Sequence, residues 1–554
     1  MTPDDILRRQ ATFELTRTNF ENLWQRVAEY VLPQQDDFRR KYSQGATRTN
    51  HQYDAFPQVA LNNYAAAMEA GLTPRTNRWH HLATGYPEID DNHEVKLYAE
   101  NLSELLWRMR YSPRANFASQ NHQVLMFNGA FGNGVMFIEP HPKGFGSIYT
   151  SPHLNEMFWS QNEHGFIDTF HRKRMISIRS LIARFGTSRL PDKIMKQVKA
   201  GKIDEEYELL HCVMPRKDVD PMRLDAKGMP YTDMYILIDG KVPLQDVDEA
   251  GYRELPYMVF RHTVSSREDY GRGPGTMMLP NIKMINMMAR DVIEAANMAV
   301  DPPTLLHADN ILSEFRLTPG ARNYGGVDDN GKQMAIPYQN GADVGITLEM
   351  IQDVRAQIDD VFLGGYFRVL MENPNMKATT AMLLSQQQGQ KTSPVVGRGH
   401  SEYLNPMLRR ESGITFRQGL HPEMPDVLVE FLRATRQPMT MQYDSPMTRA
   451  SRIAEAVGLQ QSFEALAPWA QIKGETVYRR FDEDQVAKIM AEVNGVPAKA
   501  LKSDEQLEAE DAQQAEMAAT QMALEAAPVA ANTVKTLADA QVASASVPQQ
   551  IAGA

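Results

Sequence analysis

Two amphipathic segments of similar length constrain this sequence more than any other feature. In residues 277–301, apolar residues recur at alternating three- and four-residue steps, which is the spacing of a narrow stripe on one face of an α-helix. Residues 346–363 carry a second stripe of the same kind. The two segments therefore predict helices that pack against other helices. The stripe residues are Met278, Ile282, Ile285 and Val292 in the first segment, and Ile351, Val354, Ile358 and Val361 in the second.

The segment between the two stripes cannot continue either helix. Asp301-Pro302-Pro303 ends the first helix, because proline lacks the backbone donor that the next turn requires. Residues 302–345 are rich in Gly, Pro, Asn and Asp, with short apolar pieces such as Thr304-Leu305-Leu306. We therefore expect a small, strand-containing insertion, so that the whole unit is a helical hairpin with a head.

The residues before this unit mix helical and strand patterns. Helical periodicity occurs in residues 4–32, 55–71, 102–109 and 117–127. Strand-like segments cover residues 135–140, 166–170, 207–214, 234–238 and 257–262. Acidic pairs, glycines and prolines separate these strands, as in the hairpin signal of residues 238–241. The sequence therefore predicts an α+β fold, predominantly helical, with an antiparallel sheet.

The C-terminal part of the chain is helical, with interruptions. A polar stretch at residues 385–394 separates two helical patterns, and further helical patterns cover about 445–500. Beyond about residue 503 the chain is rich in Ala, Gln and Glu, which permits an exposed helix to about residue 525. We expect residues 526–554 to form a flexible tail, because they have little apolar surface to bury.

Composition limits the environment and the partners of this chain. A net charge of −11 argues against tight clamping of duplex DNA, which depends on cationic contacts to phosphates. It leaves open a protein that surrounds DNA and lets it slide. No run approaches the roughly 20 apolar residues that span a bilayer. Residues 1–5 begin an amphipathic pattern without the features of a secretion signal, so we expect the protein to start in a cytoplasm.

The sequence lacks the motifs of common catalytic sites. It has no Gly-x-x-x-x-Gly-Lys-Ser/Thr loop, no His-Glu-x-x-His motif and no Gly-x-Ser-x-Gly elbow. Residues 271–275 (Gly-Arg-Gly-Pro-Gly) do not have the spacing of a dinucleotide-binding loop, and we interpret them as a flexible entry into the helix at Met277. The sequence therefore predicts neither an enzyme nor a cofactor site.

No metal site is predicted either. The single cysteine, Cys212, lies in a strand-like apolar segment, where we interpret it as a small core residue. We interpret His80-His81, beside Trp79, as surface or interface packing. We interpret the acidic pair Asp328-Asp329 as a turn and the acidic pair Asp359-Asp360 as a solvated helix face.

Several segments resemble, in the same order, the head-to-tail connector or portal family of short-tailed bacteriophages. The most specific are residues 270–275 and 300–303, which flank the first stripe, and residues 376–381 (Met-Lys-Ala-Thr-Thr-Ala), where Ala381 stands in place of the usual Glu. The others are the first helix with Trp24, Ala28, Tyr30 and Pro33; residues 70–74 followed by Trp79, a shortened form of the family pattern; residues 131–134; and residues 165–186.

The resemblance implies an elongated subunit of a ring with twelve copies at one capsid vertex. It implies that residues 1–276 and 364–444 form a wing, that residues 277–301 and 346–363 form a two-helix stem, and that residues 302–345 form a clip. A helical crown would cover residues 445–525.

The resemblance also implies a channel for double-stranded DNA, with a tunnel loop near residues 385–400. We expect Lys391, Arg398 and His400 to approach DNA there, because they lie in a polar segment between helices; an ordinary surface role is equally compatible with the sequence. The implied partners are the large terminase subunit, tail adaptor or tail tube proteins, and the major capsid and scaffolding proteins. The implied location is the virion, after assembly in the host cytoplasm.

Two other interpretations remain open at this point. A tail adaptor or scaffolding protein is a second structural possibility, although adaptors are usually much shorter and need no helix–insertion–helix unit. A metal-dependent enzyme acting on nucleic acid is the third, and it requires clustered carboxylates.

Overall fold

The computed structural model describes residues 2–300, apart from isolated positions between 41 and 247, together with 304–306, 335–337, 344–364, 393–435, 439–443 and 458–469, and scattered positions between 481 and 517. The chain divides into two compact units. The first comprises the described parts of 1–82, 102–422 and 441–457, and the second those of 83–101, 423–440 and 458–554. Lys391, the turn predicted at residues 328 and 329, most of the predicted crown and the C-terminal tail lie outside the described residues.

Three long helices form the centre of the first unit. Helix α1 begins with a capping box, in which the side chains of Thr2 and Asp5 each accept a hydrogen bond from the other's backbone N–H. Helix α5 ends at Gly132, whose φ of 81° reverses the chain into the first strand of a sheet. The helices are α1 (Pro3–Val31), α2 (Phe56–Leu72) and α5 (Phe117–Phe131).

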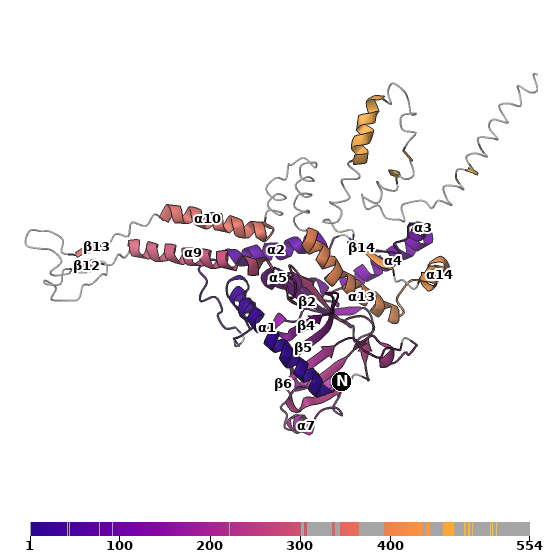
Figure 1. Cartoon of the computed structure of the whole chain (residues 1–554), viewed down its shortest axis with the longest axis horizontal. Helices are drawn as coiled ribbons and strands as arrows, with labels where there is room; N and C mark the ends of the chain where they lie inside the picture. Colours follow the sequence, from indigo (N-terminus) through magenta and orange to yellow (C-terminus); the bar gives the residue numbers. More distant parts are fainter. Residues whose placement is uncertain are drawn as a thin grey trace, which may run out of the picture. The chain divides into compact units, whose positions relative to one another are not determined.

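Where the strand patterns predicted one antiparallel sheet, the structure has two larger ones after these helices (Figure 1). The three-stranded sheet has the order β11-β2-β3, and the five-stranded sheet has the order β4-β5-β6-β8-β9. The predicted turn at residues 239–241 joins β8 to β9, with Gly240 at φ 80°. The strands are β2 (Asn133–Pro140), β3 (Ser147–Thr150), β4 (Met157–Gln161), β5 (Ile167–Ser177), β6 (Glu206–Val213), β8 (Met234–Leu237), β9 (Val242–Gln245) and β11 (Tyr257–Arg261).

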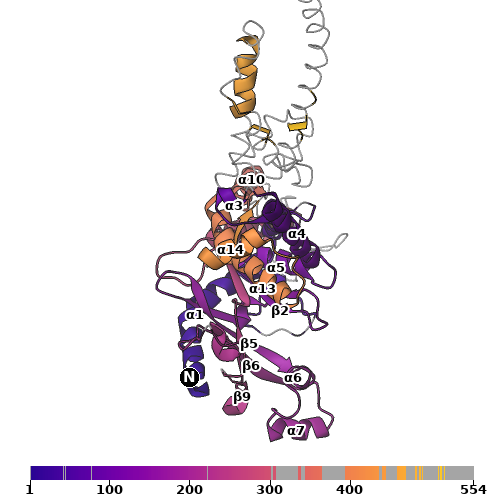
Figure 2. The ribbon, with the colours of Figure 1, turned by 90° about the vertical axis from the view of Figure 1, so that its right-hand side faces the viewer.

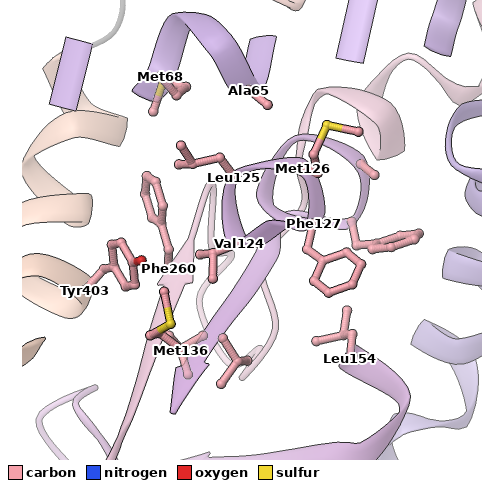
Figure 3. Packing of buried hydrophobic residues seen from close by; sticks show 14 of the residues in the cluster. Ala65, Met68, Val124, Leu125, Met126, Phe127, Met136, Leu154, Phe260 and Tyr403 are labelled. Carbon is pink, nitrogen blue, oxygen red and sulfur yellow. The ribbon is translucent and has the colours of Figure 1, made fainter. Parts of the chain in front are cut away.

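The main hydrophobic core lies where α5 meets α2 on one side and the three-stranded sheet on the other. Figure 3 shows Val124 and Leu125 of α5 close to Met68 of α2, to Phe260 of β11 and to Met136 of β2. A second, smaller core packs helices α6 (Ile178–Phe185) and α7 (Asp192–Lys199) against the five-stranded sheet (Figure 2). The predicted core role of Cys212 is confirmed, since it is fully buried in β6.

The glycine-rich entry to the first stripe helix is closely packed, so its interpretation as a flexible segment is wrong. A Cβ atom on Gly273 would lie 2.3 Å from the carbonyl oxygen of Asn128, and one on Gly275 would lie 2.7 Å from that of Ala130. The backbone of Arg272 also pairs with Thr263 in both directions. Glycine is needed here because two backbones approach within a distance that leaves no room for a side chain.

Replacement of Gly273 with alanine is expected to destabilise the protein by about 1–3 kcal/mol, because the new Cβ must push α5 away from this segment. Thermal unfolding would measure the change. Gly397 is the matched control, since a Cβ there would meet no atom within 4 Å and its φ is ordinary. A Gly273→Ala variant as stable as Gly397→Ala would contradict the close approach.

The stripe helices are α9 (Leu279–Val300) and α10 (Val344–Val361), and α9 is preceded by the short helix α8 (Pro274–Met277). Between them lie β12 (Thr304–Leu306) and β13 (Ala335–Pro337), which pair antiparallel. The predicted strand-containing insertion thus has two short strands among its described residues, and Figure 1 shows these beyond the ends of α9 and α10.

A buried ion pair joins two further helices of the first unit. The Arg110 guanidinium donates to Glu411 at 3.0 Å from Nε to Oε1 and at 2.5 Å from Nη2 to Oε2. Both side chains are almost inaccessible, and Arg110 also lies over the ring of Trp79. Glu411 belongs to α13 (Asn405–Arg417), which follows a π-helix at Gly399–Leu404.

The remaining elements are shorter or belong partly to the second unit. They are α3 (Pro87–Asp90), α4 (His93–Arg110), α14 (Asp426–Thr435), β1 (His80–Ala83), β7 (Tyr231–Thr232), β10 (Gly251–Tyr252), β14 (Thr440–Tyr443), and the 3-10 turns Pro33–Gln35, Leu154–Glu156, Ala226–Gly228 and Asp239–Lys241. Among the described residues, none of the helices is long and apolar enough to span a membrane.

Buried neutral histidines make the fold sensitive to acid. His171 of β5 is fully buried, its Nδ1 donates to Gln10 Oε1 at 3.0 Å, and its Nε2 has no hydrogen-bond partner in the described part of the chain. Burial lowers the pKa of His171 to about 3. In the unfolded chain, His171 therefore takes up a proton as the pH falls through about 6.5. In the folded protein, the same ring is protonated only near pH 3.

Stability is expected to fall as the pH drops from 6.5 toward 3, and His171 alone accounts for a loss of about 2 kcal/mol at pH 5. Thermal unfolding of the wild type and of His171→Gln at pH 7.5 and 5.0 would measure it. The variant should show a smaller change with pH, whereas the exposed His164→Gln should retain the wild-type change. Equal changes in all three proteins would refute this assignment.

Candidate functional site

The α9–α10 pair carries the stripe residues that the sequence singled out. Ile282 and Ile285 of α9 are fully buried, while Met278 and Val292 are partly buried against the main core. The side chains of Asn281 and Gln357 are joined by a hydrogen bond of 3.0 Å between the two helices. On α10, the buried stripe residues are Ile351, Val354 and Ile358.

At the end of α10 the buried face departs from the predicted spacing. Val361 is only partly buried, and the next residue, Phe362, is fully buried. The interpretation of Asp359 and Asp360 as a solvated face holds only for Asp360, because Asp359 is 8% exposed. Successive residues of an α-helix are rotated by about 100°, so the buried face of α10 drifts away from a strict seven-residue repeat of apolar residues. Phe362 therefore faces the core in place of Val361.

A short loop fixes the base of this helix pair to the N-terminal part of the chain. The buried Asn286 side chain of α9 accepts a hydrogen bond from the Tyr53 N–H at 2.7 Å and donates to the carbonyl oxygen of His51 at 2.9 Å. Asp54 is almost inaccessible and pairs with Arg355 of α10 at 2.9 Å. The pair is thus held at its base by specific polar contacts as well as by the apolar stripe.

Exposed apolar side chains lie on both sides of the buried stripe. At 100° per residue, Met284 and Ile293 fall on opposite sides of the stripe of α9, and both are more than 40% exposed. On α10, Leu348 and Met350 also fall on opposite sides of the stripe. On α9, Met287 lies on the face opposite the stripe, and its side chain is 64% exposed. A helix pair with apolar residues on two different flanks has surface suited to two different neighbours.

Of the three residues predicted to approach DNA, the structure describes Arg398 and His400. Arg398 is partly exposed and lies 3.6 Å from Glu402, whose carboxylate accepts two hydrogen bonds from the buried Arg261 of β11. Lys391 is not among the described residues. Arg398 therefore stands at the start of the π-helix, on a segment anchored by a buried ion pair.

His400 has an environment different from that of a solvated cation. Its ring stacks on Tyr443 at 4.0 Å between ring centroids, and its Nε2 is buried without a partner in the described structure. Burial lowers the pKa of His400 to about 4, so the ring is neutral at pH 7. Any positive charge offered by this segment thus comes from the other two residues.

The remaining candidates do not form a catalytic or metal centre. His80 is buried and its ring contacts Trp79, so only His81 fits the predicted surface position. Burial holds the pKa of His80 well below its usual value. Within the described ranges, no three metal-ligating side chains gather in one place.

The contacts of the helix-pair base were not predicted. The Asn286 side chain bonds to backbone groups more than 200 residues away, so this contact leaves no spacing pattern in the sequence. Asp54 has no other acidic residue near it in the sequence that would mark it out. Only the run of polar residues before α2 could have suggested a capping or clamping loop.

The described residues form a mixed α+β fold with a paired-helix unit. The family of bacteriophage head to tail connecting proteins matches residues 4–501, and the chain belongs to this family. It is 25% identical to the portal protein of Salmonella phage epsilon15, over 99% of this chain and 98% of that protein. It is also 23% identical to the probable portal protein of Bordetella phage BPP-1, over 89% of this chain and 87% of that protein.

The family membership confirms the resemblance and removes one of the two other interpretations left open above. Proteins of this family are structural connectors of the phage virion and not enzymes, so a metal-dependent enzyme acting on nucleic acid is excluded. The chain is a connector at the junction of head and tail.

Proposed function

We propose that this protein assembles into a closed ring, of twelve copies, through which double-stranded DNA enters and leaves the capsid. The observation that carries the proposal is the exposed apolar surface on both flanks of the α9–α10 pair. A cyclic ring uses one heterologous interface, so each copy must offer two different surfaces, one to each neighbour. An acidic protein suits a channel that surrounds DNA without clamping it.

In this proposal the α9–α10 pair is the stem, covering residues 277–301 and 346–363. Residues 302–345 form the clip, which would dock the large terminase subunit during packaging and the tail adaptor proteins afterwards. Residues 1–276 and 364–444 form the wing, which would face the capsid and scaffolding proteins. The crown covers residues 445–525, and residues 526–554 form a flexible tail.

Negative-stain electron microscopy and native mass spectrometry of the purified protein test the ring. We expect closed rings with a central hole and a mass of twelve copies. Rings of another size would correct only the number of copies. A protein that stays monomeric over a range of concentration, salt and magnesium would overturn the proposal and favour an adaptor or scaffolding role.

Within the ring, we propose that residues 385–400, of which 393–400 are helical in the structure, line the tunnel and bring Lys391, Arg398 and His400 close to DNA. Replacing all three with glutamine is expected to reduce packaged DNA or its retention, while rings still form, because Lys391 and Arg398 lose their cationic contacts to phosphate, whereas His400 is neutral at pH 7 and contributes no charge. Packaging efficiency and nuclease-protected DNA would measure the effect. The matched control neutralises the exposed Lys193, Lys196 and Lys199 of α7, and equal behaviour of both triple variants would reject the loop assignment.

A further inference from the structure

A small polar pocket lies between the two sheets of the first unit and interrupts their apolar contact. Its volume is about 60 Å³, which is room for several water molecules or one small oxyanion. Its walls come from β2, β3 and β11 of one sheet, from β5, β6 and β8 of the other, and from α6. The lining residues are Phe137, Glu139, Thr150, Arg172, Arg174, Arg184, His211, Tyr235 and Tyr257.

Three guanidinium groups meet at this pocket, and two of them have partners. Arg172 pairs with Glu156 at 2.9 Å. Arg184 pairs with Glu139 at 2.6 Å and donates to the Tyr235 hydroxyl. These two arginines are therefore neutralised by the protein itself.

Arg174 is the third arginine, and its charge is not neutralised. It lies two residues after Arg172 on β5, so both side chains emerge from the same face of the sheet. It has no hydrogen bond or ion pair with any residue that the structure describes, although it is only partly exposed. Burial and the nearby charge of Arg172 lower the pKa of Arg174, which shows that its surroundings disfavour the cation.

The other polar groups of the pocket are already committed to each other. The Tyr257 hydroxyl donates to His211 Nδ1 at 2.7 Å, and His211 Nε2 donates to Asp233 at 3.0 Å. Burial lowers the pKa of His211, so the ring is neutral at pH 7. The carboxylates of Asp233, Glu139 and Glu156 each have a partner, and none is engaged with Arg174.

We propose that this pocket binds a small oxyanion, with Arg174 as its main partner and Arg172 and Arg184 at its rim. A guanidinium matches two oxygens of phosphate, sulfate or a carboxylate with parallel hydrogen bonds. The oxyanion has two possible sources, free inorganic phosphate or an acidic side chain of a neighbouring copy. In either case it neutralises a cation between the two sheets and stabilises their contact.

Calorimetric titration of the full chain with inorganic phosphate, at constant ionic strength, tests this site. We expect saturable binding to the wild type, loss of at least about tenfold in affinity in Arg174→Lys, and no binding in Arg174→Gln. Arg179→Gln on α6 is the matched control, because it removes an exposed guanidinium from the same part of the fold. Phosphate should also raise the Tm of the wild type and of this control, but not of Arg174→Gln, which separates binding from general salt effects.

A second measurement identifies the source of the oxyanion. If phosphate gives no heat but Arg174→Gln weakens self-association in sedimentation velocity, relative to Arg179→Gln, the pocket takes a carboxylate of a neighbouring copy. If neither phosphate binding nor self-association distinguishes Arg174→Gln from Arg179→Gln, the proposal is wrong. Neither result depends on the proposed DNA channel.

Discussion

Replacement of Glu411 with glutamine is expected to lower the free energy of unfolding by about 3–5 kcal/mol, because it leaves the buried Arg110 guanidinium without a counter-charge. Both side chains are shielded from water, so solvent cannot take over the role of the carboxylate. The fall in the midpoint of thermal or urea unfolding would measure the effect.

Two controls separate the lost charge from lost packing. The double variant Arg110→Met/Glu411→Leu should recover most of the stability, since it removes both charges and keeps apolar volume. Glu104→Gln, which breaks the exposed ion pair with Arg108 one turn away, should cost less than about 1 kcal/mol. A Glu411→Gln variant no less stable than Glu104→Gln would show that the buried pair contributes little.

The double variant Met287→Asp/Met350→Asp is expected to abolish ring assembly, with a dissociation constant raised at least about 100-fold. The proposed interface would have to bury two new carboxylates without partners, each at a cost of several kcal/mol. Sedimentation velocity and negative-stain images would measure the assembly, and circular dichroism would check that the exposed substitutions leave the subunit folded.

The control for this experiment is Met222→Asp, which changes a 91% exposed methionine in the loop before β7. It should assemble as the wild type does. Rings formed equally well by the double variant would place the subunit interface on another surface than the α9–α10 pair.

The helices of this protein were predicted more completely than their contacts. The stripes of α9 and α10 are visible in the sequence because burial of one face imposes a regular spacing. Strand β5 was predicted only as far as Phe170, but it extends to Ser177. The charged run Arg172-Lys173-Arg174 concealed the rest, because a strand with cations on both faces has no alternation of apolar and polar residues.

The candidate site shows the same limit. The sequence singled out Arg398 and His400 from their polar neighbourhood, but it could not show that His400 would stack on Tyr443. The arginine cluster around Arg174 was also missed, since Arg184 of α6 becomes a neighbour of the β5 arginines only because α6 packs back against the five-stranded sheet. Charges that meet through the packing of a helix on a sheet leave no regular spacing in the sequence.

The loop that holds the base of the helix pair has a consequence for how the chain is made. Asp54 and Arg355 are 301 positions apart, so a ribosome adding about 5–20 residues per second completes Arg355 roughly 15–60 s after Asp54. Asn286 is synthesised before Arg355, and α9 can form locally as soon as it has been made. However, α10 cannot pack against α9 until it has been synthesised as well. The nascent chain therefore exposes the apolar stripe of α9 until α10 has been made, which makes the first unit a candidate client for host chaperones during that interval.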